Sequence, residues 1–552
     1  MPTPRVVLAL VVLALAASLG CTASRRDPGD VGPGGGGDRE AGNGGGTDAY
    51  VEPVDVDLVT PSAPSDAPTR FGGAADPAHT PELVYPLDGV MVPPNLSQLE
   101  FHYLPNGGTV FQLAFTAGPS HVRVYFGCPE SVGAGCVFLP DESVWSVLSA
   151  AARGRGAISY VLRSVDASGN VGETAARAIT FAQQDVTGGV YYWTPNANGG
   201  INRFEFGVAG AHAERFLNVG NTAGTVCLGC HTLSRDGTLI AVGEDTPTTR
   251  FEVFDIATRS QRFLLRSVGG SGPLGGPQQS NFTSFSPDNA MIVGSSFAGL
   301  RFFSGVDGAP IEEGVTGAAA SMPDWSPDGE HIVFVQYPGR GVLGLFDSNN
   351  VTSGNIVRLD RAGGSWTVGP TLASAGGGNN FHPSYSPDGA WVLYNRSPSN
   401  IGSLGENPDS GTSRIADEEM WVVSSDGTGA AISLDTIHGL SDAWPRFNPT
   451  SFREGGHDLF WLVWASRRGY GLRLDTDTRS QLWMAAFDPT RAAAGQDPTS
   501  VPFWMPFQDL EQTNHLAQWV STVVRRTCTM DADCGGEFCV AGRCFETRPG
   551  PI

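Results

Sequence analysis

Residues 227–231 have the types and the spacing needed for redox chemistry, since they read Cys-Leu-Gly-Cys-His. Two thiols separated by two residues can add to the two vinyl groups of one haem, and the histidine that follows can become an axial ligand of its iron. The motif therefore predicts a covalent haem c on Cys227 and Cys230, with His231 as the axial ligand. Two alternatives stay open: a disulfide or free redox pair formed by the cysteines, or a different metal ion at His231.

The second axial position of such a haem needs another histidine or a methionine, or it stays open for a small ligand. His515 is the first candidate, because it lies where the end of a repeated region must close beside its beginning. His382 and Met505 are further candidates. A second protein ligand would favour electron transfer, whereas an open position would permit sensing of a small ligand or peroxide chemistry.

The charge and the remaining motifs exclude several other functions. All 34 basic residues are arginine, and with 56 acidic residues they give a net charge of −22 over 552 residues. Such a chain repels nucleic acids, and it has no lysine to hold a nucleotide phosphate or to form an imine. It has no Gly-x-Ser-x-Gly nucleophile motif, and its Asp-rich segments 475–478 and 531–533 lack the acidic residue that completes a calcium loop. We therefore expect no nucleotide, no nucleic-acid partner and no catalytic residues.

The Cys-x-x-Cys-His motif lies inside an internal repeat. Segments that begin at Leu233, Phe285, Trp325 and Tyr385 follow the pattern apolar-Ser-(Pro/Arg)-Asp-(Gly/Asn), and a degenerate fifth segment begins at Phe447. In each, the first residue is expected in the core, the Ser-Pro-Asp sequence fixes a turn, and Gly or Asn supplies a positive φ. Apolar strands follow every turn, so the spacings of 40 to 62 residues predict one four-stranded sheet for each repeat.

This repeat resembles that of the TolB-type β-propellers, and the resemblance covers roughly residues 186–524. It implies a propeller over residues 185–525 with six blades or seven, closed by the segment from Phe503 to Trp519. Nothing before this region resembles the small α/β domain that precedes the propeller in TolB. The partners of that protein are therefore not transferred to this chain.

Two smaller folded parts flank the predicted propeller. Residues 80–184 contain short alternating strands and resemble bacterial immunoglobulin-like or fibronectin-like sandwiches, with a disulfide expected between Cys128 and Cys136. Residues 526–545 are too few to enclose a hydrophobic core, so two disulfides of open pairing are expected to define a small module there. This module resembles Cys-rich modules of secreted and surface proteins of myxobacteria, and residues 546–552 form a tail. Its four cysteines are Cys528, Cys534, Cys539 and Cys544.

The amino-terminal region predicts export and a membrane anchor. After Arg5, a run of 14 small and apolar residues is too short to span a bilayer and is typical of a signal peptide. Residues 18–21, Ser-Leu-Gly-Cys, resemble a bacterial lipoprotein signal, which implies that Cys21 is lipidated; an ordinary secretory signal is the alternative. Residues 22–79 are rich in Gly, Pro and Asp and predict a disordered tether.

The sequence thus predicts an all-β, monomeric outer-membrane lipoprotein that faces the periplasm or the cell surface. Its first predicted function is that of a haem c module for electron transfer or for redox or ligand sensing. The alternative is a non-enzymatic envelope or cell-surface protein whose propeller binds a protein, a peptide or a glycan. In that alternative, Cys227 and Cys230 form a structural disulfide.

Overall fold

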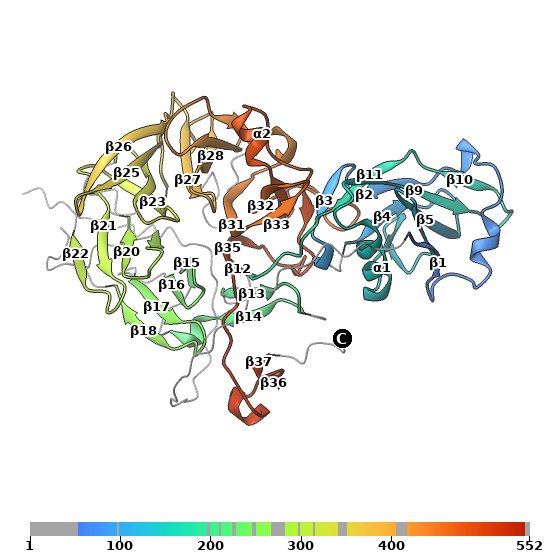
Figure 1. The fold of residues 1–552 in the computed structure, drawn as a ribbon, viewed down its shortest axis with the longest axis horizontal. Coiled ribbons are helices and arrows are strands. Elements are labelled where there is room, and N and C mark those ends of the chain that lie inside the picture. Colours follow the sequence, from blue (N-terminus) through green and yellow to red (C-terminus); the bar gives the residue numbers. More distant parts are fainter. Residues whose placement is uncertain are drawn as a thin grey trace, which may run out of the picture.

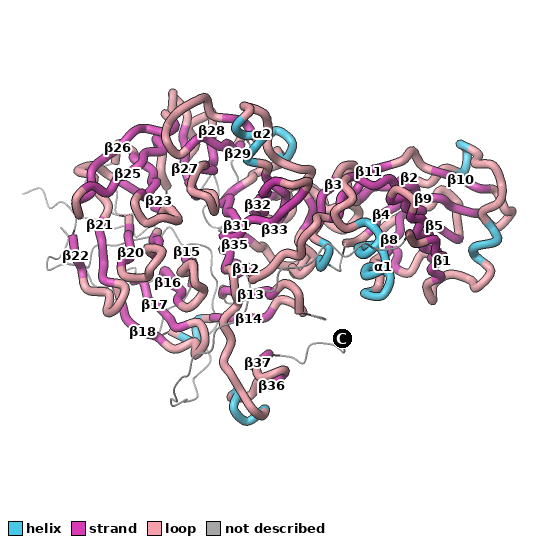
Figure 2. The backbone as a smooth tube through the Cα atoms, in the orientation of Figure 1, coloured by secondary structure: helices cyan, strands magenta, loops and turns pink. Residues whose placement is uncertain are grey.

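The computed structural model confirms the all-β class. It has two α-helices in its described part, α1 (Glu142–Ala152) and α2 (Pro489–Ala493), and its other long elements are strands. Figure 2 shows this predominance of strands. Neither helix is long and apolar enough to cross a membrane. The predicted signal peptide and Cys21 lie outside the described residues, which are 53–96, 99–195, 199–208, 211–222, 228–244, 250–265, 282–295, 299–312, 315–339, 350–403 and 417–546.

Two sheets packed face to face form the amino-terminal part of the fold (Figure 1). The larger sheet has the order β1-β6-β5-β9-β11-β3, with β10 beside β9, and the smaller has the order β2-β4-β8-β7. Rings from both sheets meet between them: Phe101 lies 6.2 Å from Phe115, and Phe126 stacks on Phe138 at 3.9 Å. The strands are β1 (Asp55–Val59), β2 (Glu82–Tyr85), β3 (Val90–Val92), β4 (Phe101–Leu104), β5 (Val110–Ala117), β6 (Ser120–Phe126), β7 (Glu130–Val132), β8 (Gly135–Phe138), β9 (Ala157–Val165), β10 (Val171–Glu173) and β11 (Arg177–Phe181).

Ordered structure begins well before residue 80, so the predicted extent of the tether was wrong. Strand β1 pairs in parallel with β6, and both of its aspartates form ion pairs with Arg123. Phe71 is buried against Tyr125, with ring centroids 5.6 Å apart. The Gly and Pro content, averaged over residues 22–79, concealed a five-residue alternating strand and one aromatic anchor. Residues 22–52 lie outside the described part.

Six four-stranded sheets in the described part of the chain are arranged in a ring, which is a β-propeller (Figure 1). Six inner strands, β35, β15, β19, β23, β27 and β31, contact one another in this order around the axis. From the inner to the outer strand, the first three sheets are β35 (His515–Val520), β12 (Gly189–Trp193), β13 (Ile201–Glu205) and β14 (Glu214–Leu217); β15 (Leu228–Leu233), β16 (Leu239–Glu244), β17 (Arg250–Asp255) and β18 (Gln261–Leu264); and β19 (Thr283–Phe285), β20 (Met291–Gly294), β21 (Arg301–Ser304) and β22 (Pro310–Glu312).

The ring is closed by a strand from the end of the repeated region. Strand β35 pairs antiparallel with β12, so that Trp519 lies opposite Val190 and closure falls at the end of the predicted segment. Such pairing joins the two ends of the ring by backbone hydrogen bonds. The other three sheets are β23 (Ala320–Trp325), β24 (His331–Gln336), β25 (Asn355–Ala362) and β26 (Ser365–Ala373); β27 (Asn379–Tyr385), β28 (Trp391–Ser397), β29 (Glu419–Ser424) and β30 (Ile432–Ser433); and β31 (Ala443–Glu454), β32 (His457–Ser466), β33 (Gln481–Phe487) and β34 (Phe503–Trp504).

The repeated turns have the local chemistry that the sequence predicted. In the turn after β23, the Ser326 hydroxyl donates to Asp328 at 2.5 Å and accepts the backbone N–H of His331 at 2.9 Å. Gly329 follows with φ 76°. The serine thus ties both ends of the turn together, and Ser234, Ser286 and Ser386 do the same in their own turns.

The three disulfides predicted in the described part of the chain are formed. One bond joins Cys128 to Cys136. The carboxy-terminal module, with β36 (Phe538–Val540) and β37 (Arg543–Phe545), has the pairs Cys528–Cys539 and Cys534–Cys544. Buried Arg525 anchors this module on the first sheet through Glu205 at 2.6 Å and Glu214 at 2.5 Å, with Phe545 stacked 4.0 Å away.

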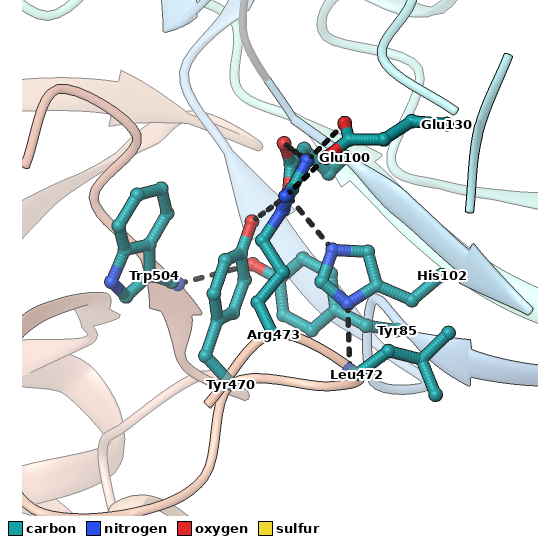
Figure 3. A network of polar contacts seen from close by, with 8 residues as sticks. All are labelled: Tyr85, Glu100, His102, Glu130, Tyr470, Leu472, Arg473 and Trp504. Carbon is teal, nitrogen blue, oxygen red and sulfur yellow. Dashed lines mark hydrogen bonds and ion pairs between the residues drawn. The ribbon is translucent and has the colours of Figure 1, made fainter. Parts of the chain in front are cut away.

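A polar network joins the two-sheet part to the propeller (Figure 3). Glu100 on the two-sheet side accepts hydrogen bonds from Arg473 (2.7 and 2.8 Å), from the Tyr470 hydroxyl (2.7 Å) and from His102 Nε2 (2.8 Å). His102 Nδ1 accepts the Leu472 N–H at 3.1 Å, so the proton of its ring lies on Nε2. Burial alone would raise the pKa of Glu100, but these hydrogen bonds lower it from 4.5 to about 2.

Candidate functional site

The inner strands close the axis of the propeller with a layer of side chains. Residues with positive φ, Met322, His382, Trp444 and Leu516, lie at register shifts of β23, β27, β31 and β35. Such bulges turn a side chain away from the regular alternation of the strand. Here they pack: His382 stacks on Trp444 at 3.5 Å, and Phe282 lies 5.7 Å from Trp444. We call these five residues the axial layer; all are buried.

His231 lies on β15, immediately after Cys230, whereas Cys227 lies outside the described residues. The imidazole is 2% exposed, its Nε2 is 3.4 Å from the Tyr191 carbonyl oxygen, and its Nδ1 is buried without a described partner. Burial, with a smaller contribution from the Arg446 cation, lowers the pKa of His231 to about 4. The ring is therefore neutral near pH 7, the form that ligates metals.

His515 lies on β35, the inner strand next to β15. Both nitrogens of its ring are buried without a described partner, and its centroid lies 4.5 Å from that of Trp193. The Trp193 ring also lies 3.4 Å from the place where a Cβ on Gly229 would stand. Burial and then repulsion from His231 lower the pKa of His515 to about 3. The structure thus brings together the two histidines that the sequence singled out.

The other two predicted candidates have different surroundings. His382 belongs to the axial layer, where its Nδ1 contacts the Asn395 side-chain oxygen at 3.2 Å and its Nε2 is buried without a described partner. Met505 is fully buried in the core that the propeller shares with the two-sheet part. It does not join the cluster that contains Trp193 and the axial layer.

The chemistry of the buried histidines suits a haem-iron ligand. His231 has the arrangement of a ligating histidine, because one ring nitrogen faces a backbone carbonyl while the other has no partner. His515 lies on the strand beside that of His231, and neither nitrogen of its ring has a described partner. His231 and His515 stay the predicted iron ligands, and each has at least one ring nitrogen without a described partner.

A pocket opens along the same inner strands, on the side of the repeated turns. Each inner strand has a leucine or an aromatic residue at the same place in the repeat, and the residue just before it lines this pocket. These residues are Thr232, Ser284, Asp324, Ser384, Arg446 and Gln518. Leu233, Phe285, Tyr385, Phe447 and Trp519 also line it, together with Pro387 and Pro449, but the accessible surface is mainly polar.

Two arginines and one aspartate carry the charge of this pocket. The Arg446 Nη1 donates to the Pro383 and Pro445 carbonyls at 3.1 and 3.2 Å, and the Arg235 Nη2 donates to the Trp325 carbonyl at 2.5 Å. Asp324 accepts the Tyr385 N–H at 2.8 Å. Burial lowers the pKa of both arginines, and Asp324 opposes this effect in each case.

The sequence contained a signal for this pocket that its interpretation missed. Arg235 stands where the other intact repeats have proline, and Arg446 precedes the aromatic residue of the degenerate fifth repeat. Both are departures from the repeat pattern. A polar residue at a position that recurs around a ring points to one shared location on the axis.

Comparison with known proteins leaves the family open. No family model matches the chain, and no curated protein matches it. Among solved structures, TolB from Acinetobacter baumannii aligns at 14% identity over 66% of this chain and 79% of its own, with a TM-score of 0.39. Hydrazine synthase from Kuenenia stuttgartiensis aligns at 13% identity over 47% of this chain and 72% of its own, with a TM-score of 0.24. The function is therefore argued from the site itself.

Proposed function

We propose that this chain is an exported β-propeller protein that carries a covalent haem c at residues 227–231. The observation that supports the proposal is the environment of His231. Its neutral, buried imidazole follows the second cysteine of the motif and has one nitrogen without a described partner. Leaving a buried polar atom unpaired costs about 1–3 kcal/mol, and a ligand at that nitrogen would remove this cost.

Each residue of the motif has a separate role in this proposal. Cys227 and Cys230 hold the macrocycle through thioether bonds, and His231 binds its iron. The imidazole of His231 is 2% exposed, so the packing around it keeps water away from the iron-binding nitrogen. When bound, the haem supplies one-electron transfer or the binding of a small ligand at its second axial position.

The proposal includes the location of the protein. Lipid attached to Cys21 anchors it at the outer membrane, facing the periplasm or the cell surface, and a monomer suffices for the site. A Cys21→Ala variant with a cleavable secretory signal is then expected in the soluble fraction, while the native chain stays with the membranes. Equal membrane association of both would contradict the anchor.

The haem is tested by exporting the chain in a host that has a cytochrome maturation system. We expect a Soret band, haem staining after denaturing electrophoresis, and an intact mass increased by one haem. Cys227→Ala combined with Cys230→Ala should remove all three signals. Cys128→Ala combined with Cys136→Ala is the matched control, since it removes two cysteines and keeps the motif. The native chain could instead be folded and colourless, with a mass that shows the loss of the two thiol hydrogens of the motif. That result would show that Cys227 and Cys230 form a disulfide and hold no haem.

A second function is supported by a different observation, the pocket with its two arginines. In this alternative the propeller is a non-enzymatic binding module of the envelope for a protein, a peptide or a glycan. It does not require haem, and the disulfide outcome of the preceding experiment would favour it. His515 then serves as a packing residue against Trp193.

A further inference from the structure

The two pocket arginines have no carboxylate partner in the described part of the chain. Arg235 and Arg446 hydrogen-bond only to backbone carbonyls, whereas most buried arginines of this fold pair with acids. Arg203, for example, contacts Glu214 at 2.6 Å. A partly buried guanidinium that has lost water and has gained no carboxylate carries a desolvation cost, which an anionic ligand offsets.

The pocket supplies more than charge. Two guanidiniums against Asp324 leave one positive charge in excess, and the neutral side chains of Thr232 and Gln518 add hydrogen-bonding groups to the same lining. Guanidinium groups bind planar carboxylates through paired N–H donors. The accessible lining of the pocket is mainly polar, which suits a ligand group that forms hydrogen bonds.

The rim of the pocket selects against large anions. Exposed aspartates of the repeated turns, Asp236, Asp288, Asp328 and Asp388, lie at the same end of the inner strands as the pocket. Together with the net charge of −22 they repel a polyanion, while a single carboxylate meets the arginines inside.

We propose that the pocket lined by Arg235, Arg446 and Asp324 binds the carboxylate of a peptide. The proposal stands on the pocket and its charges and is independent of haem. The carboxylate is the recognised group, and the two places where a peptide carries it, an acidic side chain or the carboxy terminus, are separated by the probes below.

Isothermal titration calorimetry of the full chain tests this site with four probes. They are a capped peptide with one central glutamate, its glutamine counterpart, a neutral peptide with a free carboxy terminus, and inorganic phosphate. We expect heat from the glutamate peptide or from the free carboxy terminus, and none from the glutamine peptide. The proposal would be overturned if neither carboxylate peptide binds, or if phosphate binds more tightly than both of them.

Charge variants of the pocket make the test specific. Arg235→Gln should weaken the binding of the carboxylate peptide about tenfold to a hundredfold, as expected for the loss of a charged hydrogen bond. Asp324→Asn removes the opposing charge and should tighten binding severalfold. Arg262→Gln is the matched control, since this arginine is exposed on the outer strand β18. Because the two pocket variants change affinity in opposite directions, general unfolding cannot produce the expected pattern. Equal affinities in all four proteins would refute the site.

Discussion

Glu100 is the acceptor at the centre of the polar contact between the two-sheet part and the propeller. Glu100→Gln keeps the shape of the side chain but removes the charge that Arg473 neutralises and that accepts hydrogen bonds from His102 and Tyr470. The carboxylate is 13% exposed, and its pKa falls from 4.5 to about 2. Because a tenfold change in proton affinity is worth about 1.4 kcal/mol, this fall corresponds to about 3 kcal/mol of stability.

The pH dependence follows from the direction of the shift. A carboxylate with a depressed pKa contributes its full stability above 4.5, and this contribution is lost as the pH falls from 4.5 towards 2. Urea denaturation at pH 7 should therefore show the Glu100→Gln variant to be less stable by about 2–3 kcal/mol. Towards pH 3 the difference from the native chain should shrink.

Glu130→Gln is the matched control for this prediction. Glu130 contacts the same arginine at 2.7 Å, but its side chain is 53% exposed. Solvent screens such a pair, so its loss should cost less than about 1 kcal/mol. Equal costs for the two variants would refute the reasoning, as would a Glu100→Gln difference that does not change between pH 7 and pH 3.

Two further predictions concern the propeller. Ser326→Ala should lower the unfolding free energy by about 1–2 kcal/mol, because Asp328 and the backbone N–H of His331 lose their hydrogen bonds to the hydroxyl. Ser304→Ala, in a more exposed turn, is the control. Equal losses in the two variants would contradict the role of the repeated serine. His382 has a pKa well below 6.5 because it is buried, so it lowers stability as the pH falls below 6.5. The His382→Phe variant gives up the contact with Asn395 but has no imidazole to protonate. Its unfolding free energy, measured by urea denaturation, should therefore fall less between pH 6.5 and 4.5 than that of the native chain. Parallel curves of unfolding free energy against pH would contradict this prediction.

The features that the sequence predicted well are local. A Ser-Pro-Asp-Gly turn contains its own hydrogen-bond donors and acceptors, so its conformation follows from a few adjacent residues. The disulfide between Cys128 and Cys136 spans a sequence separation of only 8. Ring closure by β35 was predictable because the last strand of a repeated fold has to meet the first.

The features that it missed depend on distance along the chain. Glu100 and Arg473 are separated by 373 positions, and neither belongs to a motif. Strand β1 was hidden because five alternating residues between Gly-rich and Pro-rich stretches do not change an averaged composition. The pairing of the last four cysteines needs the positions of β36 and β37, since three pairings are compatible with the spacing alone.

The haem proposal and the carboxylate pocket meet at Arg446. Its cation lowers the pKa of both His231 and His382, so its field reaches the imidazoles although the side chain lines the pocket. Removing Arg446 would change both places at once and could not assign an effect to either. Arg235 is not among the groups that shift the pKa of these histidines, and His231, which follows the motif cysteines, is not among the described residues that line the pocket. Variants of Arg235 and of the two motif cysteines therefore separate the two proposals, because each changes one of them and leaves the other intact.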